Sequence, residues 1–274
     1  AWVAGPDAVE AAYGSISGWD TSRVDDMSGC CYEGSKGCPS SCSGLFPSTF
    51  NEAIGGWDVS KVTTMKNTFK QATSFDQALA WDTSKVTNMQ QTFYNARTFN
   101  SELVWDTSQV TSMYGTFSGA EAFNQPLAWD TSNVKYMEWT FGRTEAFNSA
   151  LNWDTSKVTR MDSMFYSAKA FNSELAWDTS SVMRMSSTFN GAGAFNRQLD
   201  WDVASVGFGL EPFGQMFASS ALEKDTDAGL RQLTYESFSA QNERFAAEYP
   251  SWAAPPPSPP SPPPSPPPSP PPSP

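Results

Sequence analysis

The chain contains no histidine, and this absence narrows the chemistry that it can perform. Histidine is the commonest general base and a frequent metal ligand, and every Ser-His or Cys-His nucleophile system requires it. No catalytic pair is discernible among the carboxylates, because they recur in every copy of the repeat described below. We therefore expect no enzyme activity, no catalytic residue, no metal and no cofactor.

Basic residues are also scarce, since 17 Lys and Arg stand against 29 Asp and Glu, for a net charge of -12. This charge repels phosphate backbones and anionic lipid surfaces. No apolar run approaches the roughly 20 residues that span a bilayer, and the opening AWVAGPDAVE lacks the regions of a signal peptide. We expect no nucleic-acid partner and no membrane insertion, and we interpret Ala1 as a mature N-terminus.

Cysteine occurs in one short stretch only, GCCYEGSKGCPSSC. Its four members are Cys30, Cys31, Cys38 and Cys42. An even, clustered set in a secreted chain favours two disulfides. Neighbouring cysteines rarely pair for geometric reasons, so we expect Cys30 and Cys31 each to pair with Cys38 or Cys42. A zinc site is the alternative, although the spacing lacks the usual CxxC pairs.

Tryptophan recurs at one fixed interval along most of the chain, which indicates a tandem array. The seven tryptophans are Trp57, Trp81, Trp105, Trp129, Trp153, Trp177 and Trp201, and they define a 24-residue repeat. Asp follows each tryptophan, Val lies five residues after it, Met eight after it and Phe twelve after it, up to Phe213, with Gly209 alone breaking the Met column. A degenerate earlier copy begins at Trp19, and its Phe position falls on Cys31, so the cysteine stretch is interpreted as an insertion.

Each copy is predicted to contain a strand, a turn and a helix. Val, Met and Phe are spaced by three and four residues, which is typical of one helical face. The Leu-x-Trp-Asp half is too short for a helix and is expected to be a brief strand, followed by an Asp-Thr-Ser turn. One copy buries about six large apolar side chains at roughly 2 kcal/mol each, which does not offset its backbone entropy. Stacking of copies is therefore required.

These patterns predict an α/β repeat solenoid followed by a polyproline II stalk. Residues 1–50 are expected to form an N-terminal cap that holds the degenerate repeat and the cysteine insertion. The seven repeats occupy 51–217, a C-terminal cap 218–253 and the stalk 254–274.

The unit FNSELVWDTSQVTSMYGTFSGAEAFN closely resembles the repeats of the bacterial-surface-protein (BspA-like) and mycoplasma lipoprotein families, which are variants of leucine-rich repeats. The resemblance covers about residues 50–217. It implies a curved solenoid of short parallel strands and helices on a cell surface, with roles in adhesion or assembly.

From Pro255 to Pro274 the chain contains only proline and serine, a composition that favours polyproline II over helix or sheet. At ~3.1 Å per residue the segment spans roughly 60 Å. The SPPP unit is similar to the hydroxyproline-rich glycoproteins of plant and green-algal walls, such as extensins and pherophorins, and the similarity implies hydroxylation and O-linked pentose or hexose. The positions concerned are Pro256, Pro257, Ser258, Pro260, Ser261, Pro263, Pro264, Ser265, Pro267, Pro268, Ser269, Pro271, Pro272 and Ser273. No Asn-x-Ser/Thr sequon is present. An SH3-like partner is the alternative reading of the PxxP motifs.

The repeated aspartates support two hypotheses. They are Asp58, Asp82, Asp106, Asp130, Asp154, Asp178 and Asp202. In the first hypothesis, carboxylates stacked about 4.8 Å apart bind calcium. In the second, which we favour, each carboxylate stabilises a turn by accepting backbone hydrogen bonds.

The threonine column is expected to lie in the same turns, with an ice-binding array as the alternative. Its members are Thr83, Thr107, Thr131, Thr155 and Thr179. The Trp and Met columns are expected in the core. Glu223, Asp225 and Asp227 form the only irregular acidic patch, interpreted as a solvated helical face, and the array itself is expected to contain no cleft of non-repeating polar residues.

Two functions fit this organisation. The first is a secreted structural glycoprotein of an algal or related surface or extracellular matrix, whose copies self-associate into a fibre or wall assembly. The second is an adhesin or receptor-like module whose solenoid binds a protein or glycan.

Overall fold

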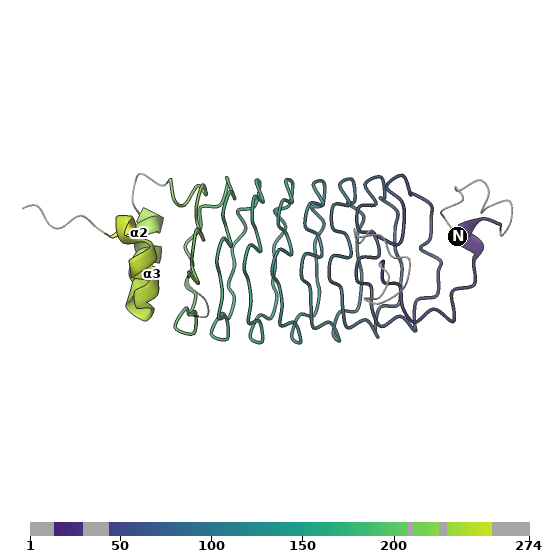
Figure 1. Cartoon of the computed structure of the whole chain (residues 1–274), viewed down its shortest axis with the longest axis horizontal. Helices are drawn as coiled ribbons and strands as arrows, with labels where there is room; N and C mark the ends of the chain where they lie inside the picture. The colour runs from purple at the N-terminus through teal and green to yellow at the C-terminus, as the bar shows by residue number, and fades with distance from the viewer. Residues whose placement is uncertain (1–13, 30–43, 208–210, 225–228, 254–274) are drawn as a thin grey trace, which may run out of the picture.

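The computed structural model describes residues 14–29, 44–207, 211–224 and 229–253. Within these ranges each copy of the repeat forms one coil, and we name each coil after its tryptophan. Figure 1 shows the coils side by side along the long axis, with two helices, α2 (Gly229–Gln241) and α3 (Glu243–Glu248), at the C-terminal end. Two short 3-10 helices, η2 (Ile16–Gly18) and η3 (Pro250–Trp252), complete the elements of the described ranges.

Adjacent coils are joined by a parallel backbone ladder. Single bridges link Asp26, Thr64, Asn88, Ser112, Tyr136, Arg160 and Arg184 in series. Further along each coil, alternate N–H groups donate to the next coil: in the Trp81 coil those of Gln91, Phe93 and Asn95 bond carbonyls of the Trp105 coil at 2.7–2.8 Å. The backbone of one coil thus supplies the partners of the next.

The helix that we predicted from the Val-Met-Phe spacing is wrong. Two residues in each such half have a positive φ, as Gln91 (53°) and Asn95 (54°) illustrate in the Trp81 coil. An α-helix requires φ near −63°, so it cannot include them. Instead, overlapping turns form, with Thr92 N–H bonded to Met89 and Tyr94 N–H to Gln91. Successive turns and helices produce the same three- and four-residue spacings. The Val-Met-Phe spacing therefore did not distinguish between them.

The strand predicted at Leu-x-Trp-Asp is also absent from the described coils. The bridges lie instead in the half that was expected to be helical. Side chains join the coils along the remaining path. The N–H of Asn124 donates to the side-chain oxygen of Asn100 at 2.9 Å, and that of Asn148 donates to Asn124 at 2.8 Å.

The core consists of stacked columns of identical side chains. In the described coils every array tryptophan, and every Phe twelve residues after one, is buried. Neighbouring rings of the main Phe column are 5.2–5.8 Å apart, and those of the Trp column from Trp81 to Trp201 are 5.9–6.5 Å apart. Such pairs contribute roughly 0.5–1.5 kcal/mol beyond area burial. The stack is therefore stabilised chiefly by contacts between copies.

The last coil is four residues longer than the sequence columns suggested. Phe217, and not Phe213, stacks on Phe189, at 5.8 Å. The Phe165 N–H bonds the carbonyl of Thr188, whereas the Phe189 N–H bonds that of Met216, which lies four residues beyond the equivalent position of the next copy. Assignment of Phe213 to the Phe column was therefore wrong, because a fixed repeat period does not reveal an insertion.

The first coil departs from the sequence columns as well. The backbone N–H groups of Gly29 and Leu45 donate to the carbonyls of Lys66 and Thr68, which are two residues apart in the next coil. The residues between Gly29 and Leu45 are therefore an insertion in the first coil. Phe46, rather than the Cys31 position, stacks on Phe69 at 5.2 Å.

The helices α2 and α3 cover the end of the last coil. Asn242 donates to the carbonyls of Val203 and Val206 at 2.9 and 2.7 Å. Phe245 is buried with its ring edge-on to Phe213 at 5.2 Å. These contacts supply hydrogen-bond donors to carbonyls of the last coil and cover its aromatic rings. A further coil would otherwise do both.

Candidate functional site

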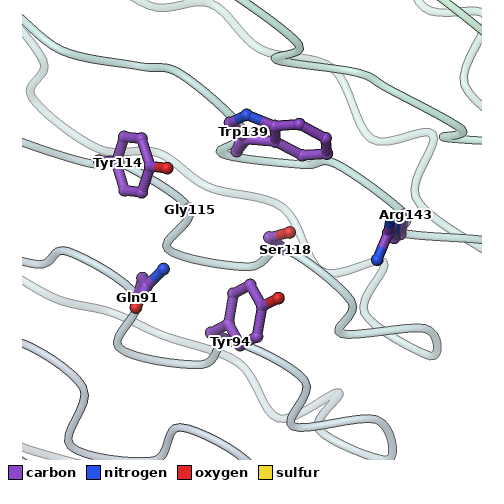
Figure 2. Close-up of a pocket in the computed structure, with 7 residues that line it drawn as sticks. All are labelled: Gln91, Tyr94, Tyr114, Gly115, Ser118, Trp139 and Arg143. Atoms are coloured by element: carbon purple, nitrogen blue, oxygen red, sulfur yellow. The ribbon is translucent and has the colours of Figure 1, made fainter. Parts of the chain in front are cut away.

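A pocket of about 170 Å³ opens on the side of the stack. We call it the aromatic pocket. Its lining residues are Gln91, Tyr94, Tyr114, Gly115, Ser118, Trp139 and Arg143. Figure 2 shows Trp139 and Tyr94 on opposite sides, with Ser118 between them. Three consecutive coils contribute, so the pocket exists only because the copies stack.

The pocket residues occupy four positions of the repeat, at 9, 10, 13 and 14 residues after tryptophan. Elsewhere these positions hold mainly small or polar side chains, such as Asn67, Ser163 and Ser187. The backbone turns here, with a positive φ at two of the four positions in each coil. Side chains at these positions range from buried, as Asn67 and Ser163, to exposed, as Tyr114.

Backbone geometry creates the space in the pocket. Trp139 has φ 59°, the left-handed conformation that its column adopts in each coil. Its indole lies over Gly142, where an added Cβ would come within 2.7 Å of the indole Cε3. A side chain at Gly142 would consequently displace Trp139.

One wall is organised by Lys70 of the preceding coil. Its Nζ donates to the side-chain oxygen of Gln91 at 3.0 Å and lies 5.3 Å from the Tyr94 ring centre. Burial lowers the pKa of Lys70 from its usual value. Because Lys70 uses the amide oxygen of Gln91, the amide NH₂ remains as the donor end of that side chain.

The opposite wall is a cluster of two rings and a guanidinium group. The guanidinium carbon of Arg143 lies 5.9 Å from the ring centres of both Trp139 and Tyr166. The two rings are tilted and 5.0 Å apart. Cation–π contacts of this kind contribute about 0.5–1 kcal/mol at exposed sites, and here they orient the indole.

Two ion pairs lie beside the pocket. Arg160 meets Glu138 at 3.6 Å, and Arg184 meets Asp162 at 3.1 Å. Burial raises the pKa of Glu138, and its Oε2 is buried without a hydrogen-bond partner. Glu138 is therefore a destabilised carboxylate close to the site, although it does not line the pocket.

The lining groups favour binding over chemistry. The lining side chains carry hydroxyl, amide, indole and guanidinium groups, and no carboxylate lines the pocket. A general acid–base pair is thus missing from this pocket. In the described ranges no cluster of three or more His, Cys, Asp or Glu could hold a metal.

The repeated aspartates lie in turns. Each accepts a hydrogen bond at 2.9–3.1 Å from the backbone N–H two residues later. The residues are Asp58, Asp82, Asp106, Asp130, Asp154, Asp178 and Asp202. Hydrogen bonds from Ser60, Ser84 and Ser180 lower the pKa of the aspartates that they contact. All seven carboxylates face solvent.

The threonine column faces inward. Each hydroxyl is buried and donates at 2.7–2.9 Å to the carbonyl of the aspartate in the next coil. Its members are Thr83, Thr107, Thr131, Thr155 and Thr179. Because these hydroxyls are not at the surface, the ice-binding alternative is wrong.

Several predicted residues lie outside the described ranges. These are the four cysteines, the Ser/Pro positions of 255–274, and Asp225 and Asp227. Glu223 is described, and its Oε2 accepts a hydrogen bond from the Ser219 N–H at 2.6 Å.

The prediction that the array contains no cleft of non-repeating polar residues is wrong. The signal was available as departures from the consensus: Trp139, Tyr114 and Tyr94 replace small or polar residues in three adjacent copies. Positions 9, 10, 13 and 14 would share one face on the predicted helix as well, because residues four apart are neighbours there. The sequence did not show that three adjacent coils bring these faces together into one pocket.

A family model described as "Mycoplasma protein of unknown function, DUF285" matches residues 7–104, 79–176 and 150–228. Together the three matches cover more than half of the chain. The chain belongs to this family. The resemblance of its repeats to mycoplasma repeat proteins is thus confirmed, and the DUF285 matches include every residue of the aromatic pocket. The matches end before the Ser/Pro segment, so the likeness of that segment to wall glycoproteins stays a prediction.

No curated protein and no solved structure matches the chain. Among the described helices, none has the length and apolar character needed to span a membrane.

Proposed function

We propose that this DUF285 protein is a non-catalytic structural glycoprotein of a cell surface or extracellular matrix. In this proposal a leucine-rich-repeat-like solenoid head binds a partner through the aromatic pocket, and an O-glycosylated Ser/Pro stalk extends from it. The assembly is a surface fibre or wall strand.

The aromatic pocket is the observation that carries this proposal. A strict repeat needs only its core columns to stack, so the array does not require aromatic side chains on this outer face. Tyr and Trp are enriched where proteins bind one another, because they offer large area at low entropic cost. Among the described coils, those around Tyr94, Tyr114 and Trp139 carry such a set.

The regular backbone ladder supports a structural role as well. Neighbouring coils pair in series, and the bridges repeat from Thr64 to Arg184 without interruption. Such a stack presents the pocket on a rigid frame, which lowers the entropic cost of binding.

A second candidate, an adhesin for a foreign protein or glycan, is favoured by the same pocket. The two differ in the natural partner. A structural protein associates with its own kind, whereas an adhesin stays monomeric until its ligand is added.

Mass spectrometry of the natively purified protein, together with electron microscopy, tests the proposal. Hydroxylation and pentose or hexose additions on residues 255–274, with filaments in the images, are the expected results. An unmodified tail on a dispersed monomer would overturn the structural role and favour the adhesin.

A further inference from the structure

The aromatic pocket selects for an unusual ligand chemistry. Three of its polar groups can only donate: the amide NH₂ of Gln91, the indole N–H of Trp139 and the Arg143 guanidinium. The hydroxyls of the pocket donate and accept, and no carboxylate lines it to accept strongly from the several hydroxyls of a sugar. A ligand with apolar rings and acceptors, but few donors, is the better complement.

Such a ligand exists within the chain itself. Residues 255–274 consist of proline and serine only. Proline carries a carbonyl acceptor and an apolar ring but no N–H. Polyproline II segments are bound by grooves lined with aromatic rings, because they are extended before binding and lose little entropy. We propose that the aromatic pocket of one copy binds the Ser/Pro segment 255–274 of another copy.

The dimensions of the two partners agree. Polyproline II repeats every three residues, or about 9.3 Å along its axis. Coils joined by a parallel ladder are about 4.8 Å apart, so two coils span about 9.6 Å. Tyr94 and Trp139 lie two coils apart on opposite sides of the pocket (Figure 2). A Ser/Pro segment that runs along the stack therefore repeats at the interval that separates the coil of Tyr94 from the coil of Trp139.

The pocket volume suits a single proline ring. At about 170 Å³ it is smaller than the roughly 300–1,000 Å³ that drug-sized ligands occupy. A sugar attached to the bound proline would not fit with it. Docking and glycosylation therefore compete for the same prolines, and the sugars proposed above would limit how many sites along the segment are bound.

A neighbouring copy is the better source of the segment than the same chain. The segment follows η3, at the end of the stack that α2 and α3 cover (Figure 1). The aromatic pocket of the same chain lies several coils away from this end, in the coils of Trp81, Trp105 and Trp129. A segment of proline and serine is stiff and contains no glycine, so folding back over those coils is unfavourable. A segment from a neighbouring copy does not have to fold back.

The test uses the full-length chain produced without proline hydroxylation or glycosylation, examined by sedimentation over a range of concentrations. We expect concentration-dependent association that a free peptide of sequence 255–274 reverses. A peptide in which alanine replaces every proline should not reverse it. A chain that stays monomeric at all concentrations, or association that the proline peptide leaves unchanged, would overturn the inference.

Variants identify the surface. Trp139→Ala should weaken association about tenfold or more, as expected for a central aromatic anchor. Gly142→Ser should weaken it too, since it displaces the same indole while leaving Trp139 in place. Tyr136→Ala is the matched control, because Tyr136 is an exposed aromatic residue of the same coil that lies outside the pocket. Equal association of the Trp139→Ala and Tyr136→Ala chains, each with an unchanged melting curve, would contradict the proposed site.

This inference rests on the proposed function, but the two fail separately. If the native tail is modified and the protein forms filaments, but association is insensitive to Trp139→Ala, only the docking inference is contradicted. If the unmodified chain associates through the pocket, but the native tail carries no modification, only the glycoprotein role is contradicted.

Discussion

Trp105 donates its indole N–H to the backbone carbonyl of Leu79 in the preceding copy, at 3.0 Å. The same bond recurs with little change in each following coil, at 3.0–3.2 Å. The path between Leu and Trp lacks a backbone ladder in the described coils, so this side-chain bond takes its place. One buried tryptophan thus sets both the packing and the register of adjacent coils.

Substitution of Trp105 by phenylalanine tests this role. The ring stack is partly kept, but the Leu79 carbonyl loses its buried donor and a cavity forms. We expect the free energy of unfolding to fall by about 2–3 kcal/mol, measured by urea denaturation. Trp139→Phe is the control, with a change below about 1 kcal/mol, because Trp139 is only half-buried. Equal losses in the free energy of unfolding for Trp105→Phe and Trp139→Phe would show that the hydrogen bond from the Trp105 indole to Leu79 does not stabilise the fold.

The turn aspartates make the fold sensitive to acid. The backbone and side-chain hydrogen bonds from Ser156 lower the pKa of Asp154. Its contribution to stability is therefore present above the unfolded pKa, near 3.8, and is lost as pH falls through the lower folded pKa. Asp154→Asn keeps the turn geometry but cannot titrate. Thermal melts between pH 7 and pH 2 should show a smaller loss on acidification for this variant than for the parent chain; identical pH profiles would contradict the assignment.

Glu138 should behave in the opposite sense. Burial raises its folded pKa above 4.5, so the ionised form destabilises the fold at neutral pH and protonation relieves this. Glu138→Gln is expected to raise the melting temperature at pH 7. The gain should vanish below about pH 4, where the parent carboxyl is protonated in both the folded and unfolded states. Loss of stability at pH 7 would instead show that the ion pair with Arg160 dominates. Asp162→Asn, in the neighbouring pair, is the comparison variant.

Asn242 joins the helical cap to the stack. It donates to Val203 and Val206 and accepts from the Arg244 N–H at 3.1 Å, as the N-cap of α3. Asn242→Ala removes all three bonds, and we expect a loss of about 2 kcal/mol in the free energy of unfolding. Glu243→Ala, one residue later in the first turn of the same helix, should change it by less than about 0.5 kcal/mol. Hydrogen exchange should then increase first at Val206 and Gly207; protection equal to that of the parent chain would contradict the capping role.

Several parts of the fold were accessible from the sequence because they depend on side-chain identity. Trp105, Phe117 and Met113 recur at a fixed interval, and only a side chain buried against its own copies needs such strict repetition. The column positions therefore predicted the core. The path of the backbone was not accessible, because the spacing of Val110, Met113 and Phe117 suits a helix and a series of turns equally.

The sequence by itself determined the repeat period, the buried columns and the proline–serine composition of residues 255–274. These are local or strictly repeated properties, so one chain displays them without a structure. Tertiary structure decided the left-handed turns, the four-residue insertion that moves Phe217 into the Phe column, and the aromatic pocket. Each of these depends on which coil donates to which carbonyl. Tyr94 and Trp139 belong to different copies and are far apart in the sequence, and they face each other only because hydrogen bonds between coils place them two layers apart.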